Sequence, residues 1–245
     1  ATEENAIAGN TSSIRINYDI DSLNSTATKV TGTVSIGGAF GAASMYNTSG
    51  GVLKLSGLNY NGSLAVKDYG INTYVGGIVG MFPLIDNSGN SQIAFNDVRV
   101  KPSGNITTLL QYTYMNAGFA STAYIGGVCG NCMSVTELSV VSVEGDIKEK
   151  QVAAANKAFY VGGLVGRSSI GAPIIVKNTY SNGSLTKEFP SNSDIGYLFG
   201  VLYGNTGRAS QFISNYHYSE EPEKIPAISI GDEAKIGRAS CRERV

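Results

Sequence analysis

Two cysteines stand three positions apart in the segment Cys129-Gly130-Asn131-Cys132. Cysteines at this spacing could form a local disulfide, act as a redox pair or supply two of the four ligands of a zinc site. The sequence has no second pair at this spacing and a single histidine, His217, so a zinc site is not indicated. Cys129 also stands where two similar segments carry valine, which favours a small, buried structural thiol over a disulfide.

Carboxylates and the histidine are the next candidates for chemistry. Glu144 and Asp146 flank a predicted turn, and Asp97 lies on a predicted strand. Glycoside hydrolysis needs two carboxyl groups about 5 to 9.5 Å apart, but the acidic residues here are scattered and do not recur at equivalent positions. No nucleophile is indicated near His217, which follows an alternating strand. We therefore predict no catalytic, cofactor-binding or metal-binding residues and no cofactor.

A glycine-rich segment occurs five times, and each copy is called a box below. The clearest box is Tyr74-Val75-Gly76-Gly77-Ile78-Val79-Gly80, and the others begin at Ser35, Tyr124, Tyr160 and Asp194. The pattern Gly-Gly-x-x-Gly differs from the Gly-x-Gly-x-x-Gly of dinucleotide-binding sites, and the sequence contains no Gly-Lys-Ser or Gly-Lys-Thr. Phosphate binding is therefore not indicated, and a structural role is favoured.

The spacing of the boxes indicates a repeat architecture. Their first glycines lie at positions 37, 76, 126, 162 and 196, which are 34 to 50 residues apart. A period in this range is typical of solenoids, propellers and arrays. Each box is followed by a turn-rich gap and an alternating strand, such as Ile93 to Val100. We predict an all-β fold, a parallel β-solenoid of about five coils; a β-sandwich or an irregular stack of hairpins is the alternative.

Stacked coils would place equivalent box residues above one another. A column of glycines would allow a close backbone approach that a Cβ would block. The fifth box departs from the others, with Tyr197 in place of the second glycine. We expect an aliphatic column and an aromatic ladder, formed by Val75, Ile125 and Val161 and by Tyr74, Tyr124 and Tyr160.

Two gaps between boxes are longer than the rest. Thr107 to Ala123 carries several aromatic residues, and the composition of Lys148 to Ala158 favours helix. We expect both to be loops that project from one edge of the solenoid, the second with a helical turn. Insertions in repeat proteins often lie on the binding face.

The composition excludes several classes of protein. Of the 245 residues, 42% are hydrophobic and 15% charged, and the net charge is -1. The apolar content is too high for a disordered chain, and the near-zero charge gives no electrostatic reason to expect a nucleic-acid partner. No apolar run reaches the roughly 20 residues needed to cross a bilayer, so we expect no membrane span in this segment.

The boxes, the Asn- and Ser-rich turns and the alternating strands together resemble the GLUG motif. The resemblance covers residues 31–218 and rests on five copies in order. The motif is a repeat of large bacterial and protist cell-surface or secreted proteins. These include filamentous-haemagglutinin-like adhesins and immunoglobulin A-specific metallopeptidases, in which it lies outside the catalytic part. The resemblance implies an extracellular or cell-surface location and assigns no functional residues.

The remaining segments are predicted separately. Residues 1–30 are expected to be a partial leading coil or a polar lead-in, with residues 1–13 loose. Residues 219–235 are expected to be a linker or an incomplete next unit. Residues 236–245 break with the preceding composition and resemble a translated sequencing adapter. We expect them to lie outside the fold and the chain to be a fragment of a longer protein.

These features favour a non-catalytic repeat segment that acts as a structural stalk and an adhesive surface. The expected partners are host or matrix glycans or proteins, bound through projecting loops. The alternative is a β-helical enzyme acting on polysaccharide, a lyase or glycoside hydrolase, which would need two or three carboxylates close together in a groove. Six N-glycosylation sequons exceed the chance number only slightly; they lie at Asn10, Asn24, Asn47, Asn61, Asn105 and Asn182.

Overall fold

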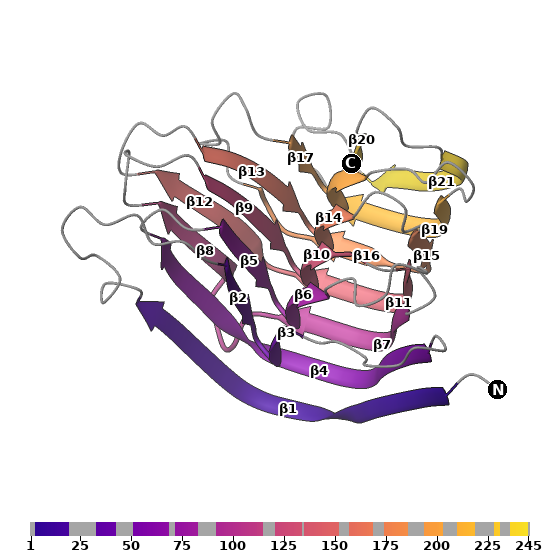
Figure 1. Cartoon of the computed structure of the whole chain (residues 1–245), viewed down its shortest axis with the longest axis horizontal. Helices are drawn as coiled ribbons and strands as arrows, with labels where there is room; N and C mark the ends of the chain where they lie inside the picture. Colours follow the sequence, from indigo (N-terminus) through magenta and orange to yellow (C-terminus); the bar gives the residue numbers. More distant parts are fainter. Residues whose placement is uncertain are drawn as a thin grey trace.

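The computed structural model shows a parallel β-solenoid (Figure 1). It describes residues 3–19, 33–42, 51–68, 72–82, 92–114, 121–133, 135–151, 157–168, 174–185, 194–202, 210–218, 228–230 and 236–244. Strands make up 81% of the structure, no helix occurs in these ranges, and the sheets are built of parallel strands. The predicted fold class is therefore confirmed.

Each coil crosses three sheets in the same order. The strands that precede the Gly-Gly pairs form the first box sheet, which contains β2 (Thr33–Gly37), β5 (Asn72–Gly76), β9 (Ser121–Gly126), β13 (Lys157–Gly162) and β17 (Asp194–Gly196). The strands that follow these pairs form most of the second box sheet, which contains β3 (Phe40–Ala42), β6 (Val79–Phe82), β10 (Cys129–Cys132), β14 (Val165–Ser168), β18 (Phe199–Leu202) and β20 (Ile228–Ile230).

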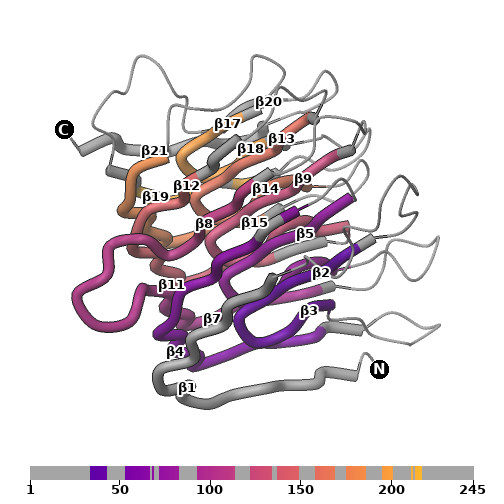
Figure 2. Tube along the Cα trace, turned by 90° about the vertical axis from the view of Figure 1, so that its left-hand side faces the viewer, coloured from indigo at the N-terminus to yellow at the C-terminus, as the bar shows by residue number. Residues whose placement is uncertain are grey.

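The third and largest sheet is called the outer sheet. It receives the remainder of each coil, which runs through the sheet as one long strand or as two shorter ones. Figure 2 shows the coils stacked along the solenoid axis. The outer sheet contains β1 (Glu3–Asp19), β4 (Gly51–Asp68), β7 (Gln92–Lys101), β8 (Thr108–Tyr114), β11 (Val135–Glu144), β12 (Asp146–Gln151), β15 (Ile174–Lys177), β16 (Tyr180–Asn182), β19 (Ser210–Tyr218) and β21 (Ile236–Arg244).

The boxes stack in register. Their first glycines pair from coil to coil in the order Gly37, Gly76, Gly126, Gly162 and Gly196. Hydrogen bonds continue around the corner of the box, because the Ile78 N–H donates to the Val128 carbonyl at 3.0 Å and the Val128 N–H donates to the Leu164 carbonyl at 2.8 Å. Neighbour-to-neighbour bonding of this kind excludes the sandwich and the hairpin stack.

A hydrophobic core lies inside the coils. On β7 the inward residues are Ile93, Phe95, Val98 and Val100, each at most 1% exposed. Tyr112 of β8 meets Phe159 of β13 edge to face, with ring centroids 5.9 Å apart. The largest fully buried side chains include Tyr60, Phe82, Phe95, Tyr112, Phe159 and Phe199. The core is therefore continuous from coil to coil rather than divided into separate clusters.

The second glycine of each box lies against the backbone of the next coil. A Cβ on Gly127 would come within 2.2 Å of the Gly163 carbonyl oxygen and within 2.5 Å of Val143 Cγ1. A Cβ on Gly163 would likewise lie 2.0 Å from the Tyr197 carbonyl oxygen. The fifth box carries Tyr197 at this position, and this residue is 5% exposed.

In each of five successive coils, one residue of the outer sheet has an unusual backbone conformation. These residues are left-handed, with φ between 51° and 65°, and comprise Gly57, Asp97, Val140, Asn178 and Ser214. They are level with one another, since their flanking residues pair across the coils. Glycine, asparagine and aspartate tolerate this conformation, whereas a β-branched side chain does not. Val140 is therefore the strained member of the column, and it is 50% exposed.

Both predicted loops are largely strand. Between Thr107 and Ala123 the chain forms β8 and the start of β9, and between Lys148 and Ala158 it forms most of β12 and the start of β13. Parallel pairing of β12 with β8 prevails over the helix-favouring composition, because intrinsic propensity yields to tertiary pairing. Residues 115–120 and 152–156, the remainder of the two predicted loops, lie outside the described residues.

The two ends of the chain also differ from expectation. The predicted loose segment 1–13 is wrong, because β1 begins at Glu3 and pairs with β4. Strand β20 lies within residues 219–235, which were expected to be a linker or an incomplete next unit, and it extends the second box sheet by pairing with β18. Residues Ile236–Arg244 form β21, which pairs with β19 through two register shifts. The expectation that this segment joins no part of the fold is therefore wrong for its backbone.

Replacing Gly127 by alanine should destabilise the fold by about 3 kcal/mol, because its Cβ would overlap backbone that cannot move independently. The free energy of unfolding in urea provides the measurement. Gly104→Ala is the control: its φ is +64° but nothing lies within 4 Å of the added Cβ, so we expect a loss of about 1 kcal/mol. Equal losses in the two variants would contradict the contact between coils.

Replacing Val140 by asparagine should stabilise the protein by about 1 kcal/mol, because asparagine adopts the left-handed conformation more readily than valine. The converse change, Asn178→Val, introduces the strain one coil further on and should destabilise by a similar amount. Thermal unfolding of both variants tests the pair. The interpretation fails if Val140→Asn melts at or below the temperature of the unsubstituted protein.

Candidate functional site

The turn that joins the two halves of each outer coil changes in length along the solenoid. In the β4 coil the strand continues without a break, whereas residues 102–107 separate β7 from β8 and Gly145 alone separates β11 from β12. The turns are packed on one another, since a Cβ on Gly145 would lie 2.5 Å from Pro102 Cγ and 2.8 Å from the Thr107 carbonyl oxygen. The longest turn, 102–107, therefore projects beyond its neighbours (Figure 2).

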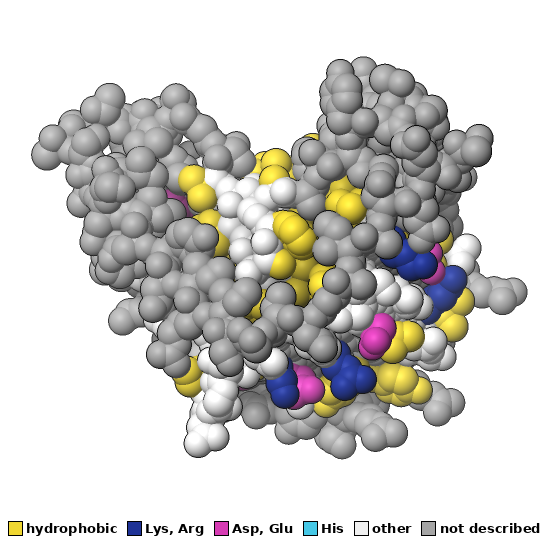
Figure 3. All heavy atoms as spheres, turned by 90° about the horizontal axis from the view of Figure 1, so that it is seen from below, with side chains coloured by type: hydrophobic (Ala, Val, Ile, Leu, Met, Phe, Trp, Pro, Cys, Tyr) yellow, Lys and Arg dark blue, Asp and Glu magenta, His cyan; other side chains and the backbone are white. Residues whose placement is uncertain are grey.

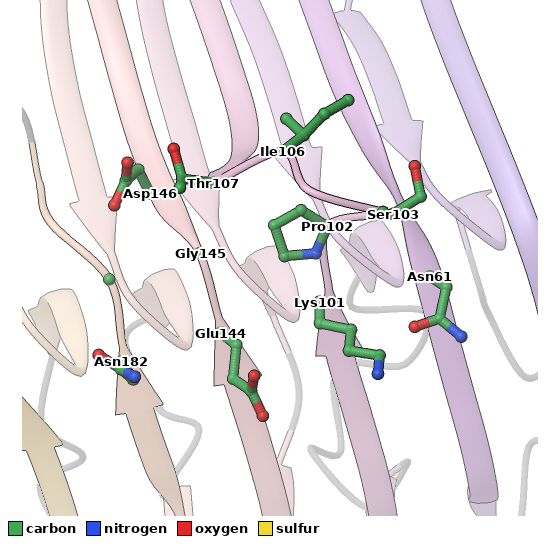
Figure 4. Close-up of a pocket in the computed structure, with 12 residues that line it drawn as sticks. Asn61, Lys101, Pro102, Ser103, Ile106, Thr107, Glu144, Gly145, Asp146 and Asn182 are labelled. Atoms are coloured by element: carbon green, nitrogen blue, oxygen red, sulfur yellow. The ribbon is translucent and has the colours of Figure 1, made fainter.

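An open groove of about 720 Å³ follows this line of turns and is called the corner groove (Figure 4). A smaller hollow of about 180 Å³, lined by Arg99 and Asn59 among others, adjoins it and shares Asn61, Lys101 and Glu144. The groove crosses four successive coils. It is lined by Asn61, Lys101, Pro102, Ser103, Gly104, Ile106, Thr107, Glu144, Gly145, Asp146, Asn182 and Gly183.

A row of outward side chains runs along one side of the corner groove. Asn61 pairs with Lys101 and Glu144 pairs with Asn182. Pairing of Val100 with Val143 brings Lys101 beside Glu144, and Figure 4 shows these two side chains on neighbouring strands. Parallel neighbours lie about 4.8 Å apart. The row therefore presents amide, ammonium and carboxylate groups at strand spacing, a pattern suited to an extended ligand.

Asp146 is held by the turn of the next coil. Its Oδ1 accepts hydrogen bonds from the Ser184 N–H at 3.0 Å and from the Ser184 hydroxyl at 2.9 Å, and its Oδ2 lies 3.4 Å from Lys148 Nζ. Burial by itself would raise the pKa of Asp146, but these Ser184 hydrogen bonds and the Lys148 ammonium outweigh it and lower the pKa below its ordinary value. Asp146 is thus an ionised carboxylate that is paired with Lys148 and whose hydrogen bonds with Ser184 hold neighbouring turns together.

Of the three carboxylates singled out in the sequence, two line the corner groove and one does not. Glu144 and Asp146 both line the corner groove, but they extend from opposite sides of Gly145 (Figure 4). Asp97 is one of the left-handed residues of the outer sheet and does not line the groove. A glycosidase needs two carboxyl groups that face one bond of the substrate. The different directions in which Glu144 and Asp146 extend do not match this requirement.

Both cysteines of the Cys-x-x-Cys segment are buried and free. Cys129 lies in register with Val79 and Val165, the valines whose position it was predicted to share. Burial, with a contribution from the neighbouring Cys132 thiol, raises the pKa of Cys129 well above its ordinary value. The thiol is therefore un-ionised at neutral pH and behaves as a core residue. The described residues contain no group of three or more acidic, histidine or cysteine side chains that could hold a metal ion.

The predicted tyrosine ladder is present. The Tyr74 and Tyr124 rings stack with centroids 5.0 Å apart, as do those of Tyr124 and Tyr160. Arg167 Nη1 donates to the Tyr124 hydroxyl at 2.7 Å, and its guanidinium carbon lies 5.1 Å from the centroid of that ring. Burial and the neighbouring Tyr124 raise the pKa of Tyr74, partly offset by Arg167 and a hydrogen bond with Asn131. These contacts join the two box sheets, so the ladder is structural.

The remaining candidates fall in different places. The backbone of His217 pairs with Ser181 within the outer sheet, and its side chain lies outside the described residues. Of the sequons, Asn61 and Asn182 line the corner groove and Asn105 lies in the turn above it. The side chain of Asn10 and the whole of residues 24 and 47 lie outside the described residues.

Lys101, Asn182 and the turn 102–107 were not singled out as functional residues from the sequence. The available signal was the turn-forming run Pro102-Ser103-Gly104-Asn105, which has no equivalent of its length in the following coil. Which side chains meet across the groove depends on the register between coils, and this register becomes visible only in the structure.

Comparison of the chain with protein-family models, with curated proteins and with solved structures found no match. Among the described residues no helix has the length and apolar character required to cross a membrane.

The pKa of Asp146 predicts a pH-dependent contribution to stability. Because the folded pKa lies below the unfolded value of about 4, this contribution is complete above that pH and is lost as the pH falls through the folded pKa. Asp146→Asn should therefore cost about 1 kcal/mol at pH 7 and progressively less in acid. Urea unfolding at several pH values provides the measurement. Glu144→Gln is the matched control, with an expected change within about 0.5 kcal/mol; an unchanged pH profile in Asp146→Asn would contradict the assignment.

Proposed function

We propose that this chain is a non-catalytic repeat segment of a cell-surface or secreted protein. In this proposal the solenoid acts as a structural stalk, and the corner groove is an adhesive surface that binds host or matrix glycans. The observation that carries the proposal is the lining of the groove, in which amide, ammonium and carboxylate side chains from successive coils stand in one row beside the hydroxyl groups of the turn 102–107. Sugar hydroxyl groups are donors and acceptors that amides and hydroxyls bind well.

The projecting turn supplies the apolar part of such a site. Pro102 lines the corner groove beside Ile106, which is 41% exposed. Aliphatic surface next to hydrogen-bonding groups suits a sugar ring, which has apolar C–H faces and a polar rim. Ser103 and Thr107 of the same turn add hydroxyl groups. The turn 102–107 thus takes the role expected of a projecting loop, although it is not one of the two loops predicted from the sequence.

A binding role is favoured over hydrolysis by the state of the carboxylates. Asp146 is committed to Ser184 and Lys148, and Glu144 extends away from it. An ionised, hydrogen-bonded aspartate is a poor general acid near neutral pH, because its pKa is shifted in the wrong direction. The uninterrupted pairing of the coils supports the stalk, since it gives a stiff rod on which the groove is held in a fixed shape.

Filling the corner groove should abolish glycan binding. Asn182→Trp places a large side chain in the row and should remove binding to every oligosaccharide that the unsubstituted protein retains on a glycan array. Lys177→Trp, on the outer sheet outside the groove lining, is the matched control and should bind normally. The proposal fails if no glycan is retained, if Asn182→Trp binds as well as the unsubstituted protein, or if mass spectrometry shows that the bound oligosaccharide has been cleaved.

A further inference from the structure

Two cations stand at the edge of the corner groove on a single strand. Arg99 and Lys101 of β7 are both exposed, and Val98 and Val100, which alternate with them, are at most 1% exposed and belong to the core. A strand rises about 3.3 Å per residue, so the two Cα atoms lie about 6.6 Å apart. Both side chains therefore leave the same face of β7, close enough to contact one ligand.

These two cations are not committed to the protein. In the described part of the chain, neither Arg99 nor Lys101 has an ion pair or hydrogen bond with another side chain. Other lysines of the outer sheet are engaged, since Lys148 lies 3.4 Å from Asp146 and Lys177 lies 3.5 Å from Glu137. An exposed cation without a side-chain partner can bind an anionic ligand without first breaking an ion pair within the protein.

One carboxylate of the corner groove, that of Glu144, also has no ion-pair partner among the described residues. Glu144 lies beside Lys101. Asp146, the other groove carboxylate, is neutralised by Lys148. The groups available to a ligand are therefore two cations, one anion and the surrounding amides and hydroxyls. This set matches a ligand that carries isolated negative charges among many hydroxyl groups.

We infer that the corner groove selects acidic glycans that carry uronic-acid carboxylates; this inference rests on the function proposed above. The planar guanidinium of Arg99 can bind a carboxylate through two parallel hydrogen bonds, and Lys101 supports it as a point charge. Glu144 and Asn182 accept hydrogen bonds from the sugar hydroxyls. A densely charged polyanion is disfavoured, because Glu144 repels it. Figure 3 shows that basic and acidic side chains are also interspersed on the face of the molecule that is seen from below.

A matched pair of probes tests this selectivity. The first probe is a hyaluronan oligosaccharide, and the second is the same oligosaccharide with its carboxyl groups reduced to alcohols. Isothermal titration at low ionic strength should show about tenfold tighter binding of the acidic form. Arg99→Gln and Lys101→Gln should each weaken binding of the acidic form about tenfold and leave binding of the reduced form unchanged. Glu144→Gln should not weaken the acidic form.

The controls separate selectivity from folding and from the proposed function. Lys177→Gln removes a cation of the outer sheet that is outside the groove lining and should bind both probes normally. Equal melting temperatures establish that the variants are folded. Equal affinity for the two probes, or an equal loss of both in Arg99→Gln, overturns the inference and leaves the proposed function standing. Binding of neither probe also overturns it, whereas the proposed function is tested separately, by the glycan array, the Asn182→Trp variant and mass spectrometry of the bound oligosaccharide.

Discussion

Backbone contact between the boxes of neighbouring coils is the constraint on which the rest of the structure depends. The glycines bring the carbonyl groups of one coil to positions where a Cβ of the coil below would otherwise lie. This approach keeps the box hydrogen bonds continuous at the corner, where two sheets meet and a ladder would usually break. Equivalent residues elsewhere in the coils, from the buried valines to the tyrosine ladder, are in register because the boxes are in register.

Much of this architecture could be predicted from the sequence. Each box is a short local motif, and the spacing of its five copies indicates which distant segments stack on one another. The parallel solenoid, the register of the boxes, the tyrosine ladder and the valine-like place of Cys129 are all confirmed. The failures concern segments without a box. Residues around Lys148 have a composition that favours helix. They nevertheless form a strand, because they pair with the edge of β8, and no local sequence pattern reveals such an edge.

The corner groove could be predicted only in part. Glu144 and Asp146 were recognised as candidates, but the role of each is set by its neighbours in other coils: Ser184 engages one, and Lys101 lies beside the other. These partners are about 40 residues away along the chain. A one-residue change in coil length would exchange them for different side chains, so composition and motif could not identify the groove.

The stacking also determines how the molecule would respond to mechanical load. Each coil is bonded chiefly to its two neighbours, so tension applied along the axis would peel coils off one at a time rather than shear the whole array. Each peeled coil would release the 34 to 50 residues between successive boxes. At about 3.3–3.6 Å per extended residue, that is about 110–180 Å of slack for each rupture. A rod built in this way dissipates a sudden pull in steps while the coils that remain stacked keep their shape.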